Sequence, residues 1–199
     1  LILGESGFVK GEKLERYINQ QVSQRPIEKL NRAFGAVVTD LANGNRVVFR
    51  RGNTGQAVRA SAAVPAVFEP VLIQGRRYVD GGLVSPIPVK TAKDMGADIV
   101  IAIDISARPD GSKALNMFGV LDQTLNIMGQ QSINEELGRA NIVIQPKVGH
   151  IGTLDLKSSN AAILEGEKAA QLKVRAIQKA VTDFRASPAA LKPAPAAKF

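Results

Sequence analysis

Residues 71–82, Val71-Leu72-Ile73-Gln74-Gly75-Arg76-Arg77-Tyr78-Val79-Asp80-Gly81-Gly82, decide the fold and the chemistry that we expect of this chain. Two short runs of β-branched, aromatic and aliphatic residues flank a turn at Gln74-Gly75, which predicts a β-hairpin. Asp80 stands where the second strand gives way to a loop, and the two glycines after it let the backbone turn sharply. The stretch therefore predicts a carboxylate displayed at the end of a strand.

Helix and strand patterns alternate along the rest of the chain. Apolar spacing and capping residues predict helices over about 11–25, 53–60, 85–96, 117–137 and 160–184. A second hairpin is predicted over 34–39 and 46–50. The runs 99–103 and 141–144, apolar apart from Asn141, are typical of parallel strands covered on both faces. This alternation predicts an α/β layered fold. We expect one domain over residues 1–186, followed by a Pro/Ala-rich linker or disordered tail over 187–199.

Two blocks, Ala60-Ser61-Ala62-Ala63-Val64-Pro65 and Asp80-Gly81-Gly82, resemble the patatin-like phospholipases in their order and separation. These enzymes are serine hydrolases that work with a Ser-Asp dyad. The resemblance extends from about Gly7 to Ile105. It implies a three-layer α/β fold with a largely parallel central sheet flanked by helices. It also implies that Asp80 is the catalytic base, while Gly81, Gly82, Ser61 and Pro65 support the site.

The nucleophile of that family is missing from the 199 residues. Its glycine-rich oxyanion loop and its Gly-x-Ser-x-Gly motif are absent. Ser6 lies in Gly4-Glu5-Ser6-Gly7, but Phe8 stands where the motif requires glycine. Ser61 lies among small residues that favour close packing under a site. We therefore expect the serine in an N-terminal segment of the same protein, and the abrupt apolar start at Leu1-Ile2-Leu3 indicates a chain cut inside a larger one.

Other polar residues have structural interpretations. An isolated Asp-Gly is an ordinary turn signal, and only the neighbouring motif blocks favour catalysis by Asp80. Asp40 and Asp104 each follow an apolar strand, and we expect them to hydrogen-bond nearby loop groups. His150 lies between glycines, as an exposed loop residue does. One His and no Cys predict no metal site and no disulfide, and the implied chemistry needs no cofactor.

The net charge of +8 predicts an anionic partner or a solvated basic surface. The basic residues are dispersed and aromatic residues make up 5%, so nucleic-acid binding is not expected. We expect a phospholipase A or lysophospholipase that acts on phospholipid at an anionic membrane surface. The alternative is a non-catalytic basic module that binds anionic lipid or another acidic partner. The protein is a possible homo-oligomer. The absence of Cys suits a bacterial cytoplasmic or secreted protein, peripheral to the membrane.

Overall fold

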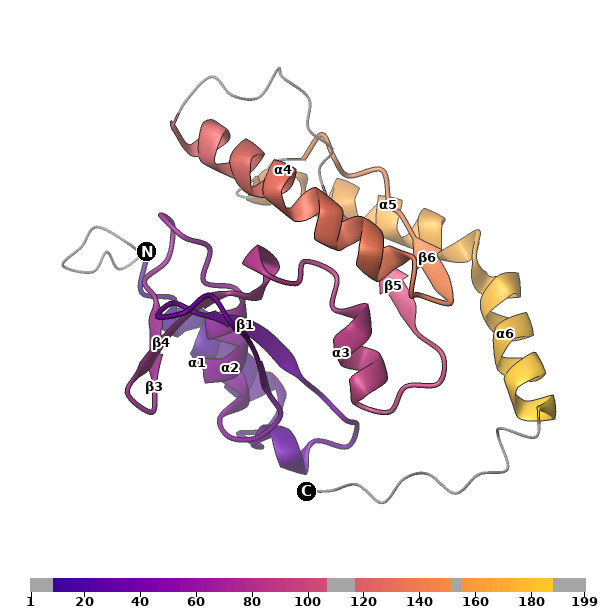
Figure 1. The fold of residues 1–199 in the computed structure, drawn as a ribbon, viewed down its shortest axis with the longest axis horizontal. Helices are drawn as coiled ribbons and strands as arrows, with labels where there is room; N and C mark the ends of the chain where they lie inside the picture. Colours follow the sequence, from indigo (N-terminus) through magenta and orange to yellow (C-terminus); the bar gives the residue numbers. More distant parts are fainter. Residues whose placement is uncertain (1–8, 107–116, 152–154, 188–199) are drawn as a thin grey trace. The chain divides into compact units, whose positions relative to one another are not determined.

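The computed structural model describes residues 9–106, 117–151 and 155–187 (Figure 1). Ser6, the N-terminal apolar triplet and nearly all of the Pro/Ala-rich tail lie outside these residues. The chain divides into two compact units, residues 1–86 with 111–133, and residues 87–110 with 134–199. Each unit is described by itself below.

The first unit contains a four-stranded antiparallel sheet of order β2-β1-β4-β3. Its strands are β1 (Ala36–Asp40), β2 (Arg46–Phe49), β3 (Val71–Ile73) and β4 (Arg76–Asp80). Both predicted hairpins are confirmed. Gln74 and Gly75 have φ of 50° and 78°, and a two-residue turn with positive φ at both positions matches the twist of the strands that it joins.

Two helices, α1 (Glu12–Gln21) and α2 (Thr54–Ser61), complete this unit with the short 3₁₀ turns η1 (Ile27–Lys29) and η2 (Gly81–Leu83). The Asn53 side chain accepts a hydrogen bond from the Gln56 N–H at 2.8 Å, which caps α2. The helices approach closely at Gly55, where an added Cβ would lie 2.3 Å from the Glu15 carbonyl oxygen. This packing holds the N-terminal end of α2 against α1.

The core of the first unit joins α2 to the sheet. It is built from the buried residues Val38, Ala60, Ala63, Val71 and Tyr78. The rings of Phe49 and Tyr78 meet edge to face with centroids 5.0 Å apart. Because Ala60 and Ala63 are small, the C-terminal end of α2 can lie directly on β1 and β4. The core therefore fixes residues 60–65 against the end of β4.

The second unit contains α3 (Val89–Asp94), β5 (Ile101–Ile103), β6 (Ile142–Ile144), η3 (Leu156–Ser158), α5 (Ser159–Gln171) and α6 (Val174–Ala186). Helix α4 (Met117–Leu137) crosses the division between the units. Strands β5 and β6 pair in parallel, as predicted. The single helix predicted over 160–184 is instead two helices. The Lys173 N–H donates to the Ala170 carbonyl at 2.9 Å, and this tight i→i−3 contact ends α5.

The α/β class is confirmed, but the described strands do not form a largely parallel central sheet. Short turns join the antiparallel hairpins, whereas β5 and β6 are separated by the long helix α4 and can run parallel. Strand β5 is also not covered on both faces, since Ile101 and Ile103 are 41% and 59% exposed. Among the described residues, no helix combines the length and apolarity needed to cross a membrane.

Candidate functional site

The backbone of Asp80 is held from two sides. Its N–H donates to the Ala63 carbonyl at 3.0 Å, and its own carbonyl accepts from the Thr39 hydroxyl at 2.7 Å. The first contact joins the two motif blocks that lie 17 positions apart in the sequence (80 − 63). The structure thus brings the Ala-Ser-x-x-x-Pro block to the residue that we predicted as the base.

The carboxylate of Asp80 uses one oxygen locally. Its Oδ1 accepts a hydrogen bond from the Gly82 N–H at 2.7 Å and so caps the η2 turn. Among the residues that the structure describes, Oδ2 has no hydrogen-bond partner. The carboxylate is therefore oriented through one oxygen, and the other remains open to accept a proton.

Burial raises the pKa of the Asp80 carboxyl above its ordinary value. The hydrogen bond from the Gly82 N–H acts in the opposite direction but is the smaller effect. The physical cause is desolvation, because a carboxylate removed from water loses hydration that its neutral form needs less. A raised pKa makes Asp80 a stronger base than a solvated aspartate.

The two glycines after Asp80 have different tasks. A Cβ at the buried Gly81 would lie 2.1 Å from the Val37 carbonyl oxygen, so this residue allows η2 to pass directly over β1. A Cβ at Gly82 would lie 3.0 Å from Oδ1 of Asp80. Neither glycine has a positive φ. The glycines are therefore not needed for a sharp turn with positive φ. Gly81 is needed because the backbones of η2 and β1 approach closely, which only the structure reveals.

The serine and proline of the other block lie at the end of α2. Ser61 and Pro65 are half-buried, whereas Ala60 and Ala63 are 0% and 2% exposed. No hydrogen bond joins Ser61 to Asp80 in this described region. The geometry fits a packing block beneath Asp80.

Asp40 and Asp104 each accept a hydrogen bond from a nearby loop N–H, as expected, and each also has a partner distant in the sequence. Asp40 is fully buried, with Oδ2 2.7 Å from the Arg76 guanidinium and Oδ1 accepting from the Ala42 N–H at 3.0 Å. Asp104 accepts hydrogen bonds from the N–H and hydroxyl of Ser106, and from the Gln145 amide at 2.9 Å. Both carboxylates therefore organise loops.

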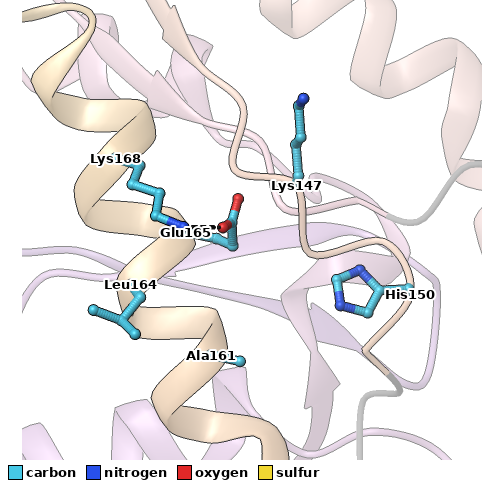
Figure 2. A pocket seen from close by; sticks show the side chains of 6 residues that line it. All are labelled: Lys147, His150, Ala161, Leu164, Glu165 and Lys168. Carbon is cyan, nitrogen blue, oxygen red and sulfur yellow. Dashed lines mark hydrogen bonds and ion pairs between the residues drawn. The ribbon is translucent and has the colours of Figure 1, made fainter.

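A basic groove lies in the second unit, with a volume of about 510 Å³. Figure 2 shows its lining residues, Lys147, His150, Ala161, Leu164, Glu165 and Lys168. Glu165 pairs with Lys168 at 2.8 Å, and this hydrogen bond lowers the pKa of Glu165, with smaller contributions from the positive charges of Lys147 and His150. Of the residues that line this groove, the sequence alone singles out only His150, as an exposed loop residue. The others come mostly from α5, and a local pattern does not show that this helix lies beside the His150 loop. In the described residues, no cluster of three or more His, Cys, Asp or Glu could hold a metal.

Comparison with known proteins agrees with the motifs. Residues 1–93 match the family described as patatin-like phospholipase. The NTE family protein Rv1063c of Mycobacterium tuberculosis is 34% identical over 109 residues, which cover 55% of this chain and 30% of that protein. Another NTE family protein of that organism, Rv2565, is 29% identical over an alignment covering 86% of this chain and 34% of its own length. The patatin-like phospholipase domain-containing protein 7 of Mus musculus is 32% identical over 53% of this chain and 8% of its own length.

The family match over residues 1–93 confirms the resemblance carried by the motif blocks. The chain spans about a third of the length of the mycobacterial relatives.

Proposed function

We propose that the full-length protein hydrolyses the carboxylic esters of phospholipids, with Asp80 as the base of a Ser-Asp dyad. The observation that carries the proposal is the Asp80 carboxylate itself, which is half-buried, held through Oδ1 and open at Oδ2. A base must be oriented and must have a proton affinity suited to its operating pH. Burial supplies the second property, because it raises the pKa of Asp80.

The proposed reaction has two halves. A serine hydroxyl, supplied from outside these 199 residues, attacks the acyl carbonyl while its proton passes to Oδ2 of Asp80. The departing alcohol takes that proton and leaves an acyl-serine ester. Water then attacks this ester, Asp80 accepts the water proton, and that proton returns to the serine as the fatty acid leaves. Backbone N–H groups of a glycine-rich loop would hold the developing oxyanion.

The proposed substrate class is a phospholipid or lysophospholipid at an anionic membrane surface. The family match supports an acyl-lipid substrate, and the net charge of +8 supports an anionic surface. The proposal places the protein peripherally on the membrane. It also keeps the largely parallel, three-layer fold for the full-length domain, where further strands would pair with β5, which has one described partner strand.

The alternative function is a non-catalytic basic module that binds anionic lipid or another acidic partner. The observation that favours it is the groove of Figure 2, which Lys147, His150 and Lys168 line. A module of this kind would bind vesicles and cleave no ester.

The deciding experiment measures phospholipid and short-chain ester hydrolysis by the full-length protein and its Asp80→Asn variant. Loss of the base should lower hydrolysis by at least about 10²-fold, while circular dichroism shows an unchanged fold. Asp98→Asn is the matched control, since Asp98 is an exposed carboxylate of the second unit and should leave activity unchanged. Activity of Asp80→Asn within about twofold of the parent would remove Asp80 from the mechanism. Vesicle binding by a parent protein without esterase activity would establish the alternative.

A further inference from the structure

Helix α6 has one apolar stripe and a basic polar face. Its apolar side chains recur at helical spacing and lie on one side of the helix, at Val174, Ile177, Val181 and Phe184. Arg175, Lys179 and Thr182 project from the other side. Such an amphipathic helix is stable where its stripe contacts an apolar surface and its polar face contacts water.

The structure covers the apolar stripe only in part. None of the residues of α6 is buried, and Val174 is 43% exposed. Leu172, immediately before the helix, is 84% exposed. Figure 1 shows α6 as a separate helix after α5. Ile177, Val181 and Phe184 are half-buried, so the described residues leave the stripe only partly covered.

The charges around the stripe point to an anionic partner. Lys173, Arg175, Lys179 and Arg185 face a single carboxylate in this segment, Asp183, which bonds Lys179 at 2.7 Å. Neither Arg175 nor Arg185 has an ion-pair partner in the described part of the chain. Long basic side chains beside an apolar stripe can lay their stems on lipid and keep their charges among the headgroups.

We propose that α6 binds flat in the headgroup region of an anionic phospholipid surface, with its apolar stripe toward the acyl chains. An anionic lipid surface engages the apolar stripe and the basic polar face of α6 together, which favours it over a protein partner. The helix then holds the protein at the surface where its substrate lies. This inference rests on the proposed function only for the identity of that surface.

The first test compares vesicle sedimentation of the full-length protein and its Arg175→Gln/Arg185→Gln variant on phosphatidylglycerol and phosphatidylcholine. The variant should bind phosphatidylglycerol on the order of tenfold more weakly, because each cation near an anionic surface contributes several-fold in affinity. Raising salt toward about 1 M should abolish the difference. Arg50→Gln/Arg77→Gln removes the same charge from exposed positions in the first unit and should stay within about twofold of the parent. Equal losses in both variants, or none in the first, would overturn the proposal.

The second test locates the inserted face. The 199 residues contain no Trp, so Phe184→Trp and Thr182→Trp each add a reporter, on the apolar and the polar side of α6. Brominated phosphatidylglycerol should quench the added fluorescence at position 184 and spare position 182, each measured against the parent. A reporter at 184 that is blue-shifted without vesicles and unaffected by them would show a protein-covered stripe and reject the proposal.

The experiments distinguish failure of the enzymatic proposal from failure of the membrane-binding proposal for α6. Hydrolysis of a soluble short-chain ester should be unchanged in the α6 variants, because the helix contributes no group to the reaction. A parent protein that cleaves no ester but binds vesicles through α6 would reject the enzymatic proposal alone. A parent protein that cleaves the ester but binds no anionic vesicle would reject the role of α6 alone.

Discussion

At the scale of single residues, the burial of Asp80, the proposed base, carries a cost in stability. Burial raises its pKa, so the ionised form is less favourable in the folded protein than in the unfolded chain. The cost is absent well below the unfolded pKa of about 3.9, grows as the pH rises from that value to the folded pKa, and is constant above it. A half-buried base is therefore expected to destabilise the fold at the pH where it works.

The first prediction follows from that sign. Asp80→Asn should raise the melting temperature at neutral pH, since the amide carries no charge to desolvate and can still accept from the Gly82 N–H. The gain should vanish toward about pH 3, where Asp80 is protonated in both states. Thermal unfolding across that pH range tests this, with Asp98→Asn as the control that shows no gain. A variant that is less stable at neutral pH would contradict the assigned cost of burial.

The second prediction concerns Gly81. Gly81→Ala should destabilise the protein by about 3 kcal/mol, because the added methyl group collides with the backbone of β1. Urea unfolding measures this change. Gly166→Ala is the contrasting control, since its Cβ would meet nothing within 4 Å in α5 and should stabilise that helix by about 0.5 kcal/mol or more. A neutral Gly81→Ala would mean that η2 can move away from β1.

At the scale of elements, the ion pair between Asp40 and Arg76 fastens β4 to the end of β1. Asp40 is fully buried, while the Arg76 side chain is 63% exposed. The carboxylate is therefore the charge that depends on the ion pair for compensation. Removing Arg76 leaves that buried charge unpaired. Charge changes at Arg76 therefore disturb the fold and cannot report lipid binding.

The third prediction is that Arg76→Met lowers the free energy of unfolding by about 2 kcal/mol, a value between those of buried and exposed pairs. Arg77→Met should change it by less than about 0.5 kcal/mol. Denaturant unfolding of both variants gives the comparison. Equal effects in the two variants would show that solvent screens the pair completely.

At the scale of the whole molecule, the fourth prediction is that the 199-residue chain alone is inactive and prone to aggregate. Ile101, Ile103 and Ile105 are 41%, 59% and 67% exposed, and β5 pairs with only one described strand. Unpaired apolar strand edges join with other chains. Size-exclusion chromatography and a fluorophosphonate probe test both expectations. A monodisperse chain that labels at Ser6 or Ser61 would place the nucleophile within these residues.

The sequence by itself determined the features that depend on neighbours along the chain. The hairpin at Gln74-Gly75 was predictable because turn chemistry is local, and the cap at Asn53 was predictable for the same reason. The family and the position of Asp80 followed from two short motif blocks. These features need no knowledge of what packs against them.

Only the tertiary structure decided the features that depend on contacts distant in sequence. The need for glycine at position 81 comes from Val37, 44 positions earlier (81 − 37), and the partner of Asp40 lies on another strand. Antiparallel pairing of β1 with β4 and the incomplete burial of the α6 stripe are likewise invisible in local patterns. An apolar spacing predicts a face to be covered, but the folded chain alone shows whether anything covers it.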